Sequence, residues 1–143
     1  MDAKSVIKQV KEQKNEIRQV YWVACGGSLV DLYPAHCMLT AESTLVESGI
    51  YTSKEFILAA PKKLGEHSLV ILCSHSGGTK ETLDAAELGL SKNAAVVMMT
   101  NHPGSLADSN KWISGSSLGR QLRREIRAES AFSGSRAWRH RNF

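Results

Sequence analysis

Hydroxyl side chains and glycines crowd into one short segment between an apolar run and a helix-like run. The apolar run is Ser68–Cys73, and the segment that follows it contains Ser74, His75, Ser76, Gly77, Gly78 and Thr79. This order predicts a strand, a loop and a helix. The start of a helix leaves backbone N–H groups without partners, and its dipole favours negative charge. The segment therefore predicts an anion site, and phosphate is the anion that such sites most often bind.

Within this segment we expect Ser74, Ser76 and Thr79 to donate hydrogen bonds to phosphate oxygens. Gly77 and Gly78 would let the backbone approach the ligand closely. The segment matches neither the phosphate loop of nucleotide-binding enzymes nor the glycine pattern of dinucleotide-binding folds. The alternative is a Ser/Gly turn in which Thr79 only caps the helix. The local sequence does not separate these two interpretations.

A second glycine turn follows another apolar segment. The segment is Gln19–Ala24, and the turn is Cys25, Gly26, Gly27 and Ser28. Ser28 would add a fourth hydroxyl to the site, although taken alone it is better explained as a helix N-cap. His75 has a side chain that could protonate a sugar oxygen. A solvated histidine without a role is the favoured alternative for that residue.

The remaining pattern alternates apolar segments with helix-like ones. This predicts an α/β fold, a three-layer α-β-α sandwich with a parallel sheet of the flavodoxin-like kind. The ends of two apolar segments carry the glycine turns, and ligands bind such sheets beyond the carboxyl ends of the strands. We expect helices at about 2–18, 29–46 (with Pro34 near the first turn), 53–58 (capped by Thr52 or Ser53, with Glu55), 79–90 and 105–108. We expect strands at 19–24, 49–51, 68–73 and 94–100.

The composition limits the classes of protein to which this chain can belong. A chain of 143 residues with 42% hydrophobic residues is expected to form one domain. We predict a cytoplasmic protein, because no apolar run suggests a signal peptide or a membrane span. The three cysteines, Cys25, Cys37 and Cys73, and the histidines have no metal-ligand spacing, so neither a metal nor another cofactor is expected.

The net charge of +4 belongs to the C-terminal end of the chain. Residues 1–113 hold 11 basic and 12 acidic residues, whereas residues 114–143 hold seven Arg and two Glu. Binding of nucleic acid or an anionic membrane through this end is a possible alternative, but we expect neither partner. The predicted organisation is an N-terminal helix (1–18), an α/β domain with the anion site (19–113) and an Arg/Ser-rich tail (114–143) that we expect to be non-native or disordered.

The two motifs together resemble the sugar isomerase (SIS) domain, a phosphosugar-binding fold with a five-stranded parallel sheet. Cys25–Ser28 follows one strand, and Ser74–Thr79 precedes a helix, in the order that this family shows. Residues 20–28, 33–34, 49–56 and 64–79 are more closely similar to the fructoselysine-6-phosphate and glucoselysine-6-phosphate deglycases. The resemblance covers about residues 18–113.

The resemblance implies that Ser74, Ser76 and Thr79 hold a sugar phosphate and that Ser28 contacts the sugar or its phosphate. It also implies hydrolysis of a phosphorylated Amadori compound, or isomerisation of a related phosphosugar. Binding without catalysis, as in a phosphosugar-sensing module, is a further alternative. Homodimers are typical of the family.

The acid/base Glu and His of the family lie in a second SIS domain, so we assign no catalytic residue in this sequence. We expect a truncated or frame-shifted product. We also expect that the sheet lacks its last strand at the C-terminal edge.

Overall fold

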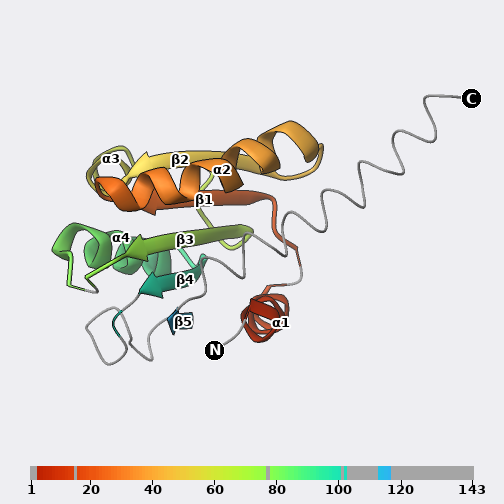
Figure 1. The fold of residues 1–143 in the computed structure, drawn as a ribbon. Helices are drawn as coiled ribbons and strands as arrows, with labels where there is room; N and C mark the ends of the chain where they lie inside the picture. The colour runs from red at the N-terminus through yellow and green to blue at the C-terminus, as the bar shows by residue number, and fades with distance from the viewer. Residues whose placement is uncertain (1–2, 15, 77, 101, 103–112, 117–143) are drawn as a thin grey trace, which may run out of the picture.

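The computed structural model describes residues 3–14, 16–76, 78–100, 102 and 113–116. Figure 1 shows that helices and strands alternate along most of this chain. The elements are α1 (Ala3–Gln13), β1 (Gln19–Ala24), α2 (Gly27–Glu42), β2 (Glu47–Thr52), α3 (Ser53–Ala59), β3 (Ser68–Ser74), α4 (Lys80–Ser91), β4 (Ala95–Thr100) and β5 (Ile113–Ser116).

The sheet has five parallel strands in the order β2-β1-β3-β4-β5. The central strands β1, β3 and β4 consist almost entirely of buried residues. Such continuous apolar runs are typical of strands that are covered on both faces. All the strands point the same way in Figure 1, so their carboxyl ends meet at one edge of the sheet.

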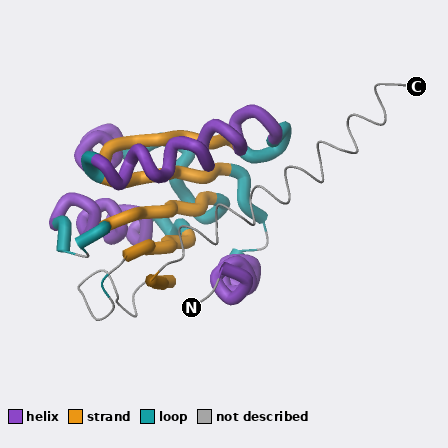
Figure 2. Tube along the Cα trace, in the orientation of Figure 1, coloured by secondary structure: helices purple, strands orange, loops and turns teal. Residues whose placement is uncertain are grey.

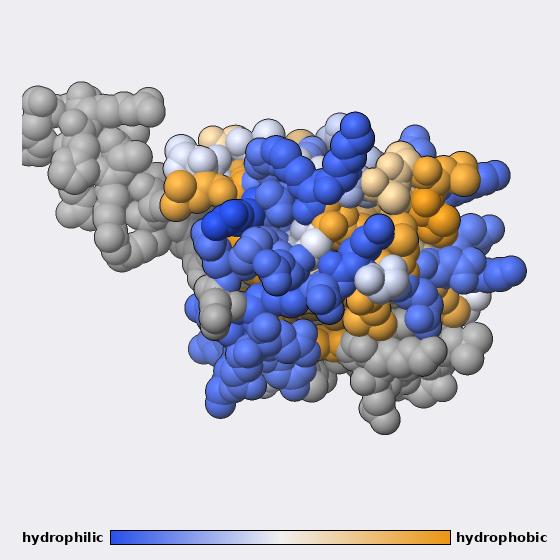
Figure 3. All heavy atoms as spheres, turned by 180° about the vertical axis from the view of Figure 1, so that it is seen from behind, coloured by the Kyte–Doolittle hydropathy of each residue, from blue (hydrophilic) through white to orange (hydrophobic). Residues whose placement is uncertain are grey.

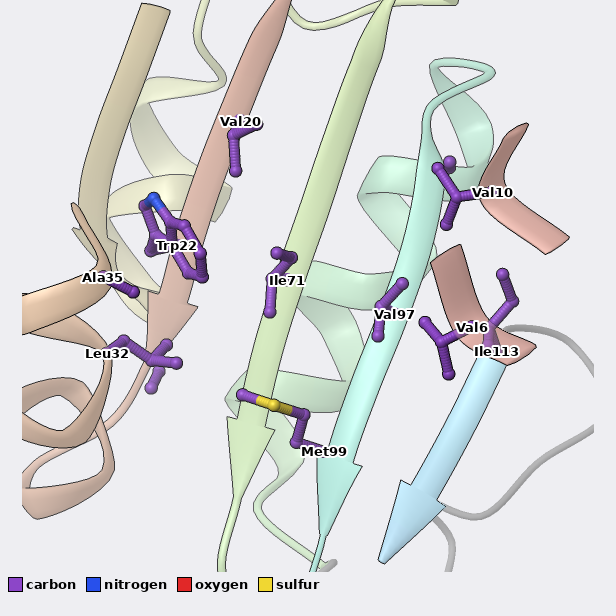
Figure 4. Close-up of a cluster of buried hydrophobic side chains, with 12 residues drawn as sticks. Val6, Val10, Val20, Trp22, Leu32, Ala35, Ile71, Val97, Met99 and Ile113 are labelled. Carbon is purple, nitrogen blue, oxygen red and sulfur yellow. The ribbon is translucent and has the colours of Figure 1, made fainter. Parts of the chain in front are cut away.

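Helices cover both faces of the sheet and complete the predicted three-layer sandwich (Figure 2). One layer is formed by α1 and α2, whose Val6, Val10, Leu32 and Ala35 share a core cluster with one face of the strands. Figure 4 shows these side chains with Trp22, Ile71, Val97 and Met99, which project from β1, β3 and β4. The helices α3 and α4 form the other layer, where Phe56, Ala85 and Ala86 pack with Val23, Val70, Leu72 and Met98.

The start of α3 is closed by its own side chains. Glu55 N–H donates to Thr52 Oγ1 at 3.2 Å, and Thr52 N–H donates to Glu55 Oε2 at 2.9 Å. This reciprocal pair is a capping box, which satisfies two N–H groups that a helix start would otherwise leave unpaired. It confirms the predicted cap at Thr52.

Two predicted helix boundaries are wrong. The N-terminal helix ends at Gln13, well before residue 18. The second helix spans Gly27–Glu42 rather than 29–46, so Pro34 lies inside it, beyond the first turn. Pro34 removes one N–H donor from the helix, but the helix continues because it packs Leu32 and Ala35 into the core.

The prediction that the sheet lacks its last strand is also wrong. A fifth strand, β5, pairs with β4 from Val97↔Ile113 to Thr100↔Ser116. Its Ser-Gly-Ser sequence has a weak preference for strands, so pairing with β4 has more influence here than local propensity. This strand crosses the expected boundary at residue 113. The helix expected at 105–108 and the tail beyond Ser116 lie outside the described residues. In the described part of the chain, no helix has the length and hydropathy to cross a membrane.

Two residues of α3 allow a matched test of its packing. Phe56 is completely buried, whereas Leu58 is 77% exposed. We expect Phe56→Ala to lower the free energy of unfolding by about 3–5 kcal/mol, because a large core side chain is lost. Leu58→Ala, in the same helix, should change it by less than about 0.5 kcal/mol. Urea denaturation followed by circular dichroism measures both values, and equal effects of the two substitutions would contradict the packing described here.

Candidate functional site at the carboxyl edge of the sheet

The two glycine turns lie side by side because their strands are neighbours. In the parallel pairing of β1 with β3, Ala24 is the register partner of Cys73. The β1–α2 turn and the β3–α4 loop therefore leave the sheet at the same level. In Figure 1 both turns lie at the left edge, where the strand arrows end. The structure thus brings Ser28 and the Ser74–Thr79 loop to one edge of the sheet.

The hydroxyls of Ser74 and Ser76 converge on that of Thr79 in the β3–α4 loop. Ser74 Oγ donates to Thr79 Oγ1 at 3.3 Å, and Ser76 Oγ lies 3.5 Å from the same oxygen. The Gly78 N–H donates to Ser76 Oγ at 3.4 Å. Ser74 is buried, Thr79 is half-buried and Ser76 is exposed, so the cluster runs from the core to the surface. The two O···O distances exceed the range of about 2.5–3.0 Å that is usual for hydroxyl hydrogen bonds, so these contacts within the cluster are weak.

Two of the three helix starts at this edge have no side-chain cap. The N-cap residue of α2 is Gly26 and that of α4 is Thr79, and neither makes a side-chain cap hydrogen bond. The start of α3, in contrast, is closed by its capping box. The first N–H groups of a helix have no partner inside it, so α2 and α4 present donors for a ligand or water at this edge.

This geometry excludes two predicted capping roles, a side-chain cap by Thr79 and an N-cap at Ser28. Thr79 occupies the N-cap position, but its side chain meets Ser74 and Ser76 instead of capping the helix. Ser28 lies in the first turn of α2, because the N-cap position belongs to Gly26. The interpretation of Ser28 as the N-cap is therefore wrong.

Gly26 gives the first turn its shape. Its φ is +55° and its ψ is −129°, a backbone conformation that residues with a Cβ rarely adopt. The turn reverses the chain from the end of β1 into the first turn of α2. A Cβ on Gly26, Gly27 or Gly78 would meet no atom within 4 Å, so all three glycines leave space around the backbone.

A buried hydroxyl pair connects the loops beneath the site, and the sequence analysis missed it. Ser53 Oγ lies 3.0 Å from Thr82 Oγ1, and Thr82 Oγ1 donates to Cys25 Sγ at 3.8 Å. Ser53 and Thr82 are completely buried. The three residues come from the start of α3, the first turn of α4 and the end of β1. No sequence signal indicates this pair, because hydroxyl residues such as Ser53 are common at helix starts.

The electrostatics of the site depend on neutral groups. Residues 25–28 and 74–79 include no Lys, Arg, Asp or Glu. Hydroxyl groups, N–H groups and helix dipoles therefore provide the positive potential. His75 is exposed on the loop, and its role stays a prediction; Gly77 lies outside the described residues. In the part of the chain that the structure describes, no group of three or more His, Cys, Asp or Glu side chains could hold a metal ion.

Comparison with known proteins finds similarity to a deglycase and to a candidate phosphosugar isomerase. The chain is 47% identical over 89 residues to fructosamine deglycase FrlB from Bacillus subtilis (strain 168), which covers 62% of this chain and 27% of FrlB. The solved structure of a candidate phosphosugar isomerase from Bacillus subtilis is 38% identical, with a TM-score of 0.72; the match covers 80% of this chain and 35% of that one. No protein-family model matches the sequence.

A more distant solved structure has the same fold. The NanR protein of Vibrio vulnificus, in complex with ManNAc-6P, is 17% identical with a TM-score of 0.64; the match covers 80% of this chain and 42% of NanR. The described residues therefore form a phosphosugar isomerase (SIS) fold, which confirms the family resemblance that the two loops predicted. The sequence similarity to a deglycase is confirmed as well, and the chain spans about a quarter of the length of FrlB.

Two adjacent glycines test the conformation of the β1–α2 turn. We expect Gly26→Ala to lower the free energy of unfolding by about 1–3 kcal/mol, because alanine is strained at a φ of +55°. Gly27→Ala is the matched control, since Gly27 begins α2 and the same methyl group would meet no atom. It should leave stability unchanged or raise it by up to about 1 kcal/mol. Urea denaturation measures both, and equal tolerance at the two positions would show that the turn lacks this conformation.

Proposed function

We propose that the carboxyl edge of this sheet binds a phosphorylated sugar. In this proposal Ser74, Ser76 and Thr79 donate their hydroxyl hydrogens to the phosphate, together with the first N–H groups of α4. Ser28 and the start of α2 face the sugar or its phosphate from the neighbouring turn. The observation that carries the proposal is the convergence of three hydroxyls on a helix start that no side chain caps.

The neutral lining suits a small dianion that must be bound and released. Hydrogen bonds to a charged group contribute about 1.5–3 kcal/mol each, so a few well-aimed donors are sufficient. The dipole of α4 adds to the attraction without a buried cation. A free sugar would gain little from this arrangement, because it lacks the phosphate charge. We therefore expect the phosphate to provide most of the binding energy.

For the reaction, we propose the hydrolysis of a phosphorylated Amadori compound, such as fructoselysine 6-phosphate, to a hexose 6-phosphate and an amino acid. The similarity to fructosamine deglycase FrlB supports this choice over other phosphosugar reactions. The second candidate is aldose–ketose isomerisation of a phosphosugar, which the similarity to the candidate isomerase of Bacillus subtilis favours. In both cases we assign binding roles only, and we expect a homodimer to be the working form.

The choice of substrate distinguishes these two reactions. Isothermal titration of the chain with fructoselysine 6-phosphate and with fructose 6-phosphate compares the two ligands at the same site. Tighter binding of fructoselysine 6-phosphate by about tenfold or more would support the deglycase proposal. Equal affinities would favour the isomerase candidate, because the amino acid part would then contribute nothing.

The phosphate contacts can be tested with three single substitutions. We expect Ser74→Ala and Thr79→Val each to weaken the binding of glucose 6-phosphate by about 10- to 100-fold, since each removes a hydroxyl donor to a charged group. Ser91→Ala is the matched control, because Ser91 is exposed at the other end of α4 and bonds to Leu88 O. Isothermal titration calorimetry measures the affinities. Unchanged binding in both site variants, or equal binding of unphosphorylated glucose, would contradict the proposal.

A further inference from the structure

A hollow lies at the end of the sheet opposite to the glycine turns. It has a volume of about 290 Å³ and lies along β1 and β2, with Tyr51 as the lining residue nearest the carboxyl edge, beside the turn at residues 61–63. Gln19 and Glu47, the first residues of their strands, contribute to its lining. It lies on the α3 and α4 side of the sheet, which Figure 3 shows with hydrophobic surface visible between hydrophilic side chains. The hollow is therefore separate from the proposed phosphosugar site.

The short length of α3 and one glycine leave this space open. Because α3 ends at Ala59, it covers only the part of the sheet near the carboxyl edge. Gly49 of β2 is the register partner of Tyr21 of β1. A Cβ on Gly49 would lie 2.9 Å from Tyr51 Cε2 and 3.2 Å from Tyr21 Cδ1. Glycine at position 49 therefore leaves room for the rings of Tyr21 and Tyr51 above the backbone of β2.

The rings of Tyr21 and Tyr51 form an aromatic wall of the hollow. Their centroids are 6.0 Å apart, and the Tyr21 ring also packs against Phe56 at 5.9 Å. Tyr21 is only 6% exposed. Such a fixed and tilted pair of rings favours the flat apolar body of a ligand over a flexible one.

The hydroxyl of Tyr21 belongs to a residue that is almost completely buried. Among the described residues, none forms a hydrogen bond with it. Burial, and to a smaller extent Tyr51 and Glu47, raise the pKa of Tyr21, so the hydroxyl keeps its proton at neutral pH. A buried donor without a partner costs about 1–3 kcal/mol. A ligand that accepts this hydrogen bond would recover that cost.

The charges around the hollow favour an anion. Glu47 is already engaged by Lys63, whose Nζ lies 2.7 and 2.8 Å from its two carboxylate oxygens. Lys62, on the same turn, forms no salt bridge with any described residue. Apart from the Glu47–Lys63 pair, the lining thus offers the positive charge of Lys62 and the hydroxyl donor of Tyr21. A carboxylate accepts hydrogen bonds from both kinds of donor.

We propose that this hollow is a second binding site, for a small aromatic carboxylate. Lys62 and the Tyr21 hydroxyl donate to the carboxylate, and the ring of the ligand packs against Tyr51. The site is separate from the proposed phosphosugar site, because its lining includes no residue of the two glycine turns. Nothing in this assignment requires that the proposed deglycase or isomerase reaction be correct.

Benzoate is the probe that tests this proposal, with neutral benzamide and cationic benzylamine of similar shape for comparison. Titration of the ¹⁵N-labelled chain, followed by NMR, should show saturable shifts of the Ser48, Gly49 and Lys62 amides with benzoate only. Lys62→Gln and Tyr21→Phe should each weaken benzoate binding by about tenfold. Lys54→Gln is the matched control, because it removes an exposed charge from α3 outside the hollow, and its effect should stay within about twofold.

Three results would overturn the proposal. The first is the absence of saturable shifts at these amides up to about 50 mM benzoate, well above the dissociation constant of any useful site. The second is equal binding of benzamide and benzoate, which would show an apolar surface that does not recognise the carboxylate. The third is an equal effect of Lys62→Gln and Lys54→Gln, which would show only a general influence of charge. Amide spectra of the variants without ligand show that each is folded before the comparison.

Discussion

The parallel pairing of β1 with β3 is the constraint on which the rest of this structure depends. Its register places Ala24 opposite Cys73, so the two turns that follow these strands leave the sheet together. A slip of one residue would turn Trp22, Val23, Ile71 and Leu72 to the wrong faces of the sheet. The two core clusters, one beneath α1 and α2 and the other beneath α3 and α4, prevent such a slip. The packing of the core therefore also determines the geometry of the proposed site.

Stability and binding have different requirements at the three helix starts of the carboxyl edge. A side-chain cap is worth about 1 kcal/mol to a helix, and α3 has one. The starts of α2 and α4 lack this stabilisation. The buried contacts among Ser53, Thr82 and Cys25 hold the three starts in place from below. The edge thus combines firm support in the core with donors at the surface that remain available to a ligand.

Much of the fold follows from the sequence because the central strands are almost continuously apolar. Two of these apolar strands end in glycine turns, so the sequence also predicts that both turns lie at one edge of the sheet. The capping box at Thr52 follows from local side-chain chemistry. Other features depend on contacts between residues far apart in the chain. β5 forms because β4 offers an edge, and Pro34 lies within a helix because Leu32 and Ala35 pack against the sheet. The Ser53–Thr82 pair spans 29 residues, and no periodicity of the sequence indicates it.

The central claim is that phosphate binds at the uncapped start of α4 and next to the β1–α2 turn. Its most direct test is an NMR titration of the ¹⁵N-labelled chain with fructose 6-phosphate, in which the backbone amides report the position of the ligand. We predict large saturable shifts at Gly78, Thr79 and Lys80 and smaller ones at Gly27 and Ser28, while Glu55 in the capped start of α3 stays unchanged. Shifts that are largest at Glu55, or absent from Gly78–Lys80, would contradict this account.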